Sequence, residues 1–359
     1  MPPLLDRPPP PTPQQFKRKH FLLLILVFFL MLLLNAALLQ NIVLHNSVIH
    51  KPISGFEKKS SPSSWDKAIL EAEVQLRNEA PSCLIPDKAK TAGLVKRALE
   101  EQRRVDPARR TNKHPHGAVS LLPLPVLNMG MPKCGSSTLF EFFDCIGFAS
   151  THWDLNTNDF EGMCMRDAVN AGLPPLATCA KQVDALMQFD VELPFGHKFP
   201  KFKSNSHRNE CFFPQLSLLD ELHEEAPNAT FVLNFRPIND WIHSIVGWSD
   251  MMHRFRDCDL PNLPRGQPTN LTDKDGVRET MALFFCSHVL HLRTFVESHP
   301  SHALIELDLY DTEVSSLVMS ALFPSPPGKL SSSECWKHKN KSKPPKKKFD
   351  SGFLDLNRQ

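Results

Sequence analysis

One stretch of the sequence, from Val126 to Leu139, constrains the fold of this chain most strongly. An apolar run that ends at Met129 predicts a buried strand, and the pattern from Ser136 onward predicts a helix. The loop between them carries glycine and a lysine, and three hydroxyl residues open the helix. Free N–H groups and the dipole of a helix N-terminus attract anions, and a lysine adds positive charge. We therefore predict that the loop binds a phosphorylated cofactor. The residues predicted to bind it are Lys133, Cys134, Gly135, Ser136, Ser137 and Thr138.

Strand and helix patterns alternate through the rest of the compact region, which predicts an α/β fold with a P-loop-like parallel sheet flanked by helices. The predicted strands are Pro125–Met129, Gly196–Phe199, Thr230–Phe235 and Ala303–Leu307. The predicted helices are Ser136–Cys145, Gln215–Glu225, Asp240–Phe255, Gly276–Ser298 and Glu313–Leu322. In such sheets a ligand binds outside the carboxyl ends of the strands, which is where the lysine loop begins.

The N-terminal part of the sequence predicts a membrane anchor. Residues 21–39 are apolar except for Asn35, and this run is long enough to cross a bilayer. Lys17, Arg18 and Lys19 precede it. Because positive residues stay on the cytoplasmic side, we expect the short N-terminal tail to face the cytosol and the rest of the chain to face the lumen. A cleaved signal peptide is the alternative, but the run is longer than a signal core and no small-residue cleavage site follows. We expect a tail at 1–20, an anchor at 21–39, a luminal stem at 40–117, a catalytic domain at 118–330 and a basic tail at 331–359.

All nine cysteines lie beyond the predicted anchor. An oxidising lumen permits disulfides among them, and the odd count leaves at least one thiol free or paired between chains. We expect Cys134 to be the free one, because a disulfide there would restrict the loop. Three N-x-S/T triplets, at Asn228, Asn270 and Asn340, are potential glycan sites. The net charge of +2 gives no support for a nucleic-acid partner.

A second motif follows a later strand. The run Thr230–Phe235 is followed directly by Arg236, and Ser244 lies early in the next predicted helix. The lysine loop, read as P-K-x-G-S-S, differs from a Walker A motif because Lys133 precedes Gly135. Together, and in this order, the two motifs resemble the 5′-phosphosulfate and 3′-phosphate motifs of membrane-anchored, Golgi-type carbohydrate sulfotransferases. The resemblance spans Leu124 to Phe323; Cys134 departs from the Ser, Thr or Gly that many members carry.

This resemblance implies in-line transfer of a sulfuryl group from 3′-phosphoadenosine 5′-phosphosulfate (PAPS) to a hydroxyl or amine of a glycan. Lys133 would neutralise the charge that develops on the leaving oxygen, and no metal is expected. Two histidines compete for the role of general base: His152, after the loop helix, and His197. Lys198 would match a lysine that lines the active site of the family.

Two other classes of function remain open. A metal-dependent Golgi glycosyltransferase is the first, because Asp257-Cys258-Asp259 mimics the D-x-D pattern that holds a divalent cation. The second is a membrane-anchored binding module without catalysis. The lysine-rich run 337–348 predicts a solvated tail, with a patch for an anionic glycan or membrane surface as its alternative. The acceptor and the oligomeric state stay undetermined.

Overall fold

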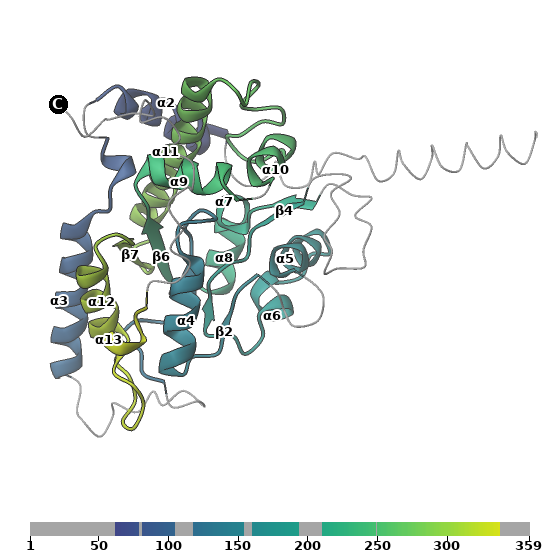
Figure 1. Cartoon of the computed structure of the whole chain (residues 1–359). Coiled ribbons are helices and arrows are strands. Elements are labelled where there is room, and N and C mark those ends of the chain that lie inside the picture. The colour runs from purple at the N-terminus through teal and green to yellow at the C-terminus, as the bar shows by residue number, and fades with distance from the viewer. Residues whose placement is uncertain are drawn as a thin grey trace, which may run out of the picture. The chain divides into compact units, whose positions relative to one another are not determined.

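The computed structural model describes residues 62–78, 81–104, 118–153, 160–193, 210–248 and 250–337, and they form an α/β fold (Figure 1). Its centre is a five-stranded parallel sheet in the order β2-β3-β1-β6-β7. The strands are β1 (Val126–Asn128), β2 (Ser150–Thr151), β3 (Ala185–Leu186), β6 (Thr230–Phe235) and β7 (Ala303–Asp308). A separate antiparallel pair is formed by β4 (Val191–Leu193) and β5 (Glu210–Phe212). The predicted α/β class and its parallel sheet are confirmed.

Helices fill the connections between the parallel strands, as right-handed crossovers require. In chain order they are α2 (Pro62–Leu76), the 3-10 turn η2 (Ser82–Leu84), α3 (Lys88–Arg104), α4 (Ser136–Ile146), α5 (Glu161–Asn170), α6 (Pro175–Cys179), α7 (Pro214–Ser217), α8 (Leu219–Glu225), α9 (Ile238–Val246), α10 (Met251–Asp257), α11 (Lys274–Ser298), α12 (Thr312–Leu322) and α13 (Ser332–Cys335). The helix predicted at Asp240–Phe255 is two helices, since α9 ends at its C-cap Gly247. The helix predicted at Gln215–Glu225 is also two, interrupted at Leu218.

The predicted strand Thr230–Phe235 is confirmed residue for residue as β6, and the first and last predicted strands differ from β1 and β7 only at their ends. The strand predicted at Gly196–Phe199 lies outside the described residues. Strands β2 and β3 were not predicted because two residues each are too short to show a period.

Strand β6, which pairs with the central strand β1, shows how the sheet separates two apolar cores. Val232 belongs to a buried cluster with α4, α12 and the segment around Trp336. Its neighbours Phe231 and Phe235 point the other way, where their rings lie 6.5 Å and 6.1 Å from Phe295 and Phe285 of α11. All six residues of β6 are buried, as expected of a strand covered by helices on both faces.

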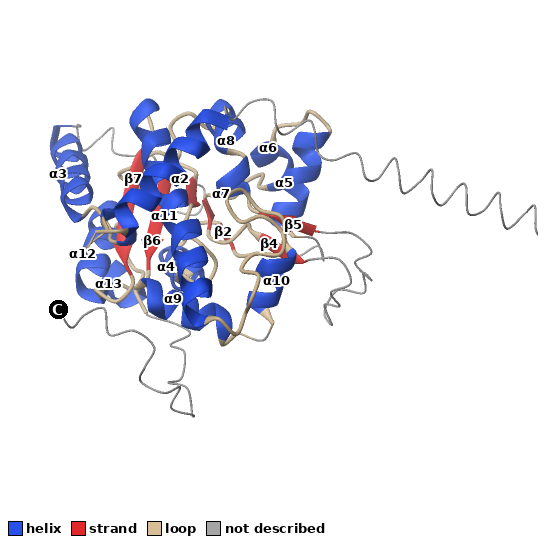
Figure 2. Ribbon diagram, turned by 90° about the horizontal axis from the view of Figure 1, so that it is seen from above, coloured by secondary structure: helices blue, strands red, loops and turns tan. Residues whose placement is uncertain are grey.

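The compact unit begins upstream of the boundary expected at residue 118. Helix α2 packs along α11, and α3 lies beside the edge strand β7 in both ribbon views (Figures 1 and 2). Thr91 bonds the edge of β7 through its hydroxyl, which accepts from Glu306 N at 3.0 Å and donates to Glu306 O at 3.3 Å. Residues 62–78 and 81–104 therefore pack as part of the domain rather than as a loose stem.

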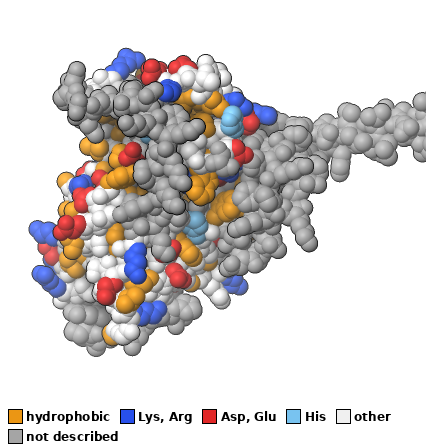
Figure 3. Space-filling model, viewed as in Figure 1, with side chains coloured by type: hydrophobic (Ala, Val, Ile, Leu, Met, Phe, Trp, Pro, Cys, Tyr) orange, Lys and Arg blue, Asp and Glu red, His pale blue; other side chains and the backbone are white. Residues whose placement is uncertain are grey.

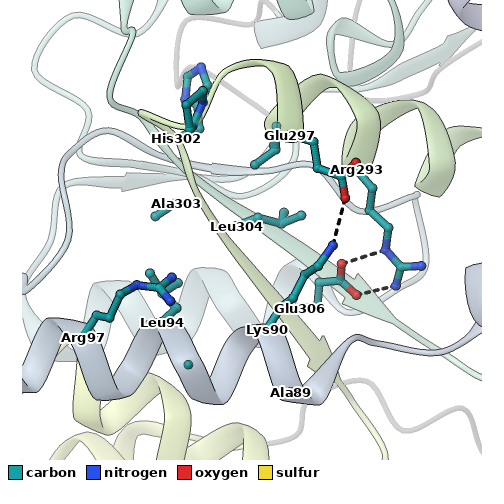
Figure 4. A pocket seen from close by; sticks show the side chains of 13 residues that line it. Ala89, Lys90, Leu94, Arg97, Arg293, Glu297, His302, Ala303, Leu304 and Glu306 are labelled. Carbon is teal, nitrogen blue, oxygen red and sulfur yellow. Dashed lines mark hydrogen bonds and ion pairs between the residues drawn. The ribbon is translucent and has the colours of Figure 1, made fainter.

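Charged side chains reinforce this joint. Arg293 of α11 holds the buried carboxylate of Glu306 at 2.6 Å and also donates to the carbonyls of Ser82 and Ile85. Lys90 of α3 reaches Glu297 at 2.9 Å (Figure 4). These pairs line a pocket between α3, α11 and β7, and none of the 13 residues that line it is a predicted site residue. Lys and Arg alternate with Asp and Glu on the neighbouring surface (Figure 3).

Four disulfides are present, and two of them join residues 203 and 190 positions apart in the sequence. The four are Cys83–Cys286, Cys145–Cys335, Cys164–Cys179 and Cys211–Cys258. Cys134 is free and buried, so the prediction that it stays unpaired is confirmed. Within the part of the chain that the structure describes, no helix is both long and apolar enough to span a membrane. The predicted anchor at 21–39 and most of the lysine-rich tail lie outside that part.

Candidate active site

The lysine loop leaves β1 through a turn that admits only glycine at one position. Asn128, the last residue of β1, accepts from Gly130 N at 3.0 Å and donates to Met187 O of the neighbouring segment at 2.6 Å. A Cβ atom on Gly130 would lie 1.6 Å from the side-chain oxygen of Asn234 on β6. The close approach of these polar side chains fixes the direction in which the loop departs.

Four carbonyl groups of the loop are held from inside the protein. Met129 O contacts His288 Nε2 at 2.7 Å, Pro132 O accepts from Trp241 Nε1 at 2.8 Å, Lys133 O accepts from Arg236 Nη1 at 3.1 Å, and Cys134 O accepts from Asn234 Nδ2. In a trans peptide the N–H points opposite to the carbonyl, so the inward carbonyl of Cys134 turns the N–H of Gly135 the other way. The amides of Ser136 and Ser137 follow in the first turn of α4, where the helix ladder offers no acceptor.

The ammonium of Lys133 lies over the face of Trp248, 3.3 Å from the ring centroid. Burial, followed by the positive charge of Arg236, lowers the pKa of Lys133 to about 8, while the carboxylate of Glu192 acts in the opposite direction. An anion between Lys133 and Arg236 would relieve their mutual repulsion. Trp248, with half of its surface exposed, has no counterpart among the predicted site residues.

Arg236 follows β6, the strand next to β1, so both motifs emerge at the same edge of the sheet. Its guanidinium lies 6.0 Å from the ring of Tyr310, which follows β7. Burial raises the pKa of Tyr310, an effect that Arg236 opposes. Ser244 is nearly buried on α9, and among the described residues no hydrogen bond joins it to Arg236. The structure thus brings Lys133 and Arg236 together, while no hydrogen bond among the described residues joins Ser244 to them.

His152 follows β2 and contacts the first two residues of α4. Its Nε2 is 3.1 Å from Ser136 Oγ and 3.4 Å from Ser137 Oγ. Burial lowers the pKa of His152, with its own backbone carbonyl acting in the opposite direction. His197 and Lys198, the other predicted catalytic residues, lie outside the described residues. Cys134 contributes no thiolate here, because complete burial raises the pKa of its thiol.

A buried acidic centre beneath the loop was missed in the sequence. Asp190 and Glu192 are 3% and 4% exposed, and Arg254 of α10 bonds Glu192 Oε1 at 3.0 Å. Asp190 accepts from the amides of Gln188 and Gln215 at 3.2 Å and 3.4 Å. Burial, together with the charge of Glu192, raises the pKa of Asp190 to about 8. The alternation of apolar and acidic residues from Phe189 to Leu193 was the available signal, since it places both acids on one face.

The D-x-D pattern is occupied by structural contacts. Cys258 is buried in a disulfide with Cys211, and Asp257 accepts from the guanidinium of Arg256 at 3.1 Å. Among the described residues, no group of three or more His, Cys, Asp or Glu side chains is arranged to hold a metal ion.

The assembled site therefore offers outward amides at a helix start, the cations of Lys133 and Arg236 close to each other, and a partly buried histidine. Such a set of donors can bind two anionic groups of one ligand and stabilise negative charge that develops between them. No protein-family model, curated protein or solved structure matches the chain.

We expect Gly135→Ala to weaken the binding of adenosine 3′,5′-bisphosphate. Gly135 has φ +96°, and a Cβ there would lie 2.3 Å from the side chain of Leu309. The left-handed backbone alone costs about 1–2 kcal/mol for alanine. Gly172→Ala is the matched control, because Gly172 has φ +71° with no atom within 4 Å of the added Cβ. Calorimetric titration should show weaker binding only for Gly135→Ala; equal affinity of both variants would contradict the loop geometry.

We expect the stability of the domain to fall as the pH drops from about 6.5 towards 4. Burial lowers the pKa of His288 to about 4, below the value of about 6.5 in an unfolded chain. The folded state therefore binds fewer protons in this range, and the stabilisation is present above pH 6.5 and lost below it. His288→Gln keeps an amide donor for Met129 O and should flatten the pH dependence of the unfolding free energy between pH 7 and 5. An unchanged slope in this variant would show that His288 does not contribute.

Proposed function

We propose that this chain is a PAPS-dependent sulfotransferase that moves a sulfuryl group to a hydroxyl or amine of a glycan acceptor in the Golgi lumen. The sheet order supports a P-loop-like arrangement, since the loop after the central strand β1 opens α4. The proposed ligand-binding set is the one predicted from the sequence: Lys133, Cys134, Gly135, Ser136, Ser137, Thr138, Arg236 and Ser244.

One observation carries the proposal. Arg236 Nη1 donates to the backbone oxygen of Lys133 at 3.1 Å, although the two residues are 103 positions apart. The two motifs therefore share one site, as a ligand with a 5′-phosphosulfate and a 3′-phosphate requires. A planar guanidinium suits a phosphate monoester, and the amides of the α4 start suit the phosphosulfate.

The chemistry follows from the charges that the chain supplies. Lys133 would neutralise the bridging oxygen as its bond to sulfur breaks, which stabilises the transition state more than the ground state. Ser136 and Ser137 amides would hold the non-bridging oxygens. Arg236 would anchor the far end of the ligand and so align the donor with the acceptor. The acceptor loses one proton to a general base, for which His152 and His197 are the sequence candidates.

The cellular setting is proposed on three features. The run 21–39 with its basic flank favours a single-pass type II membrane protein with the domain in the lumen. Four disulfides suit an oxidising compartment. Asn228 and Asn270 of the N-x-S/T triplets are exposed, as glycan acceptors must be. A glycan acceptor is preferred through the family resemblance.

The decisive experiment is transfer of radiolabelled sulfate from PAPS to a glycan array by the full-length chain. Incorporation that Lys133→Ala abolishes supports the proposal. A glycosyltransferase would instead transfer sugar and lose activity with EDTA, whereas sulfuryl transfer by this site should survive chelation. A non-catalytic module would transfer nothing, and the absence of any heat with adenosine 3′,5′-bisphosphate would reject the cofactor site itself.

A further inference from the structure

A buried hydrogen-bond chain connects the acidic centre to His152. Asp190 Oδ2 accepts from Gln188 Nε2 at 3.2 Å, and Gln188 Oε1 accepts from Ser136 Oγ at 3.0 Å. Ser136 Oγ in turn lies 3.1 Å from His152 Nε2. The chain therefore joins a carboxyl group under the loop to the imidazole at the start of α4.

The direction of each bond in this chain is set by Asp190. The Oδ2 atom of Asp190 can only accept a hydrogen bond, so the NH₂ group of the Gln188 amide must face it. The carbonyl of the same amide must therefore face Ser136. The single hydroxyl proton of Ser136 then goes to that carbonyl, which leaves only oxygen lone pairs towards His152. His152 Nε2 must supply the remaining proton, and it becomes a donor rather than an acceptor.

The other oxygen of Asp190, Oδ1, accepts from Gln215. The direction of the hydrogen bonds between Asp190 and His152 is therefore the same whether Asp190 is ionised or protonated. A proton on Asp190 can reside on Oδ1, since the amide of Gln215 can turn its carbonyl to receive it. The carbonyl oxygen of Gln215 has no other partner among the described residues. The Oδ2 atom continues to face Gln188 in both states.

Two further facts make the donor role chemically useful. Burial disfavours the charged imidazolium, so the ring is neutral, and a neutral ring has one proton to place. The Nε2 atom faces the first turn of α4, at 3.1 Å from Ser136 Oγ and 3.4 Å from Ser137 Oγ.

We propose that His152 is a neutral hydrogen-bond donor to Ser136 Oγ at the start of α4 rather than the general base, and that Asp190 is the positioning residue that keeps the ring proton on Nε2. The inference rests on the proposed sulfuryl transfer for its function, but the position of the proton does not. The proton of the acceptor then goes to a different base.

The first test reads the ring directly. The full-length chain is labelled with ¹⁵N-histidine, and the His152 signals are identified by their loss in His152→Gln. We expect the Nε2–H form in the parent protein at pH 8 and a shift towards Nδ1–H in Asp190→Leu, which removes the acceptor that fixes the Gln188 amide. The double variant Asp190→Leu with Gln188→Glu gives Ser136 a carboxylate to donate to and should restore Nε2–H. Nδ1–H in the parent protein, or no shift in Asp190→Leu, would overturn the proposal.

The second test uses activity and needs no change in the acidic centre. A glutamine side chain carries an N–H donor near the position of imidazole Nε2 but has no basic nitrogen. His152→Gln should therefore lose less than about 10-fold in kcat, well below the about 10²–10⁴-fold that a general base contributes, whereas His152→Ala should lose more. Equal, large losses in both variants, with matching melting temperatures, would assign His152 to the base and reject the donor role.

The outcomes separate this inference from the proposed function. Failure of sulfate transfer with the Nε2–H form intact would reject the sulfotransferase reaction and leave the proton position standing. Sulfate transfer with the Nδ1–H form would support the sulfotransferase reaction and reject the proposed position of the proton.

Discussion

Replacing Lys133 by alanine should reduce sulfate transfer from PAPS by about 10²–10³-fold, the effect typical of losing one group that stabilises charge in a transition state. The ammonium is the side-chain cation carried by the loop itself, and Trp248 holds it 3.3 Å from the ring centroid. Because the charge on the leaving oxygen exists mainly in the transition state, kcat should fall far more than the affinity for adenosine 3′,5′-bisphosphate. Steady-state kinetics and calorimetry on the same preparation measure the two quantities.

The pH dependence provides an independent reading of the same residue. With a pKa of about 8 in the ligand-free protein, Lys133 is protonated at neutral pH and loses its charge as the pH rises through 8. The value of kcat/KM should therefore decline above about pH 8, and Lys133→Arg should remove that decline. Lys90→Ala, at an exposed lysine of α3 that pairs with Glu297 of α11, is the charge-matched control and should keep full activity. A Lys133→Ala variant as active as this control would rule out the role.

Replacing Arg254 by alanine should destabilise the domain by about 3–5 kcal/mol, the usual cost of leaving a buried charge without its partner. Arg254 and Glu192 are 5% and 4% exposed, and the ion pair between them measures 3.0 Å. Asp190 lies beside Glu192 and adds a second acid to the same low-dielectric region, so the loss of the cation affects both. Denaturant unfolding with the disulfides intact measures the change.

Two variants make this expectation specific. Arg256→Ala removes a cation two residues further along α10 from a partly exposed pair with Asp257, and it should cost less than about 1 kcal/mol. Replacing both Arg254 and Glu192 by methionine removes the buried pair together and should recover much of the loss, since apolar pairs often replace buried ion pairs without penalty. Equal losses for Arg254→Ala and Arg256→Ala would show that the pair is not a stabilising centre.

The sequence predicted the central strands and the lysine loop because these segments carry strong local signals. Six consecutive buried residues in β6 and a glycine-bearing turn after β1 can be recognised without tertiary information. By contrast, the packing of α2 and α3 depends on Thr91, Arg293 and the Cys83–Cys286 bond, whose partners lie about 200 residues away. A pattern of charges in a helix does not reveal such a partner, so this region was expected to be a stem.

The candidate site was predictable to a similar degree. Lys133 and Arg236 follow strands directly, and neighbouring parallel strands bring their ends together. The supporting groups were hidden because their roles arise only in three dimensions. Gln188 and Asp190 follow a strand of two residues, and Trp248 follows the end of α9, so nothing local distinguishes them from ordinary core or surface positions. His152 was singled out, but the direction of its hydrogen bond required the neighbours that the fold supplies.

The covering of β7 by α3 has a practical consequence for shortened versions of this protein. An uncovered edge strand offers unpaired N–H and C=O groups to other chains and promotes self-association. A version that starts at Ala118 would lose the hydroxyl that caps Glu306 and would leave Cys286 without its disulfide partner. Soluble expression should therefore start at or before Pro62, so that the edge stays covered and no new thiol is released.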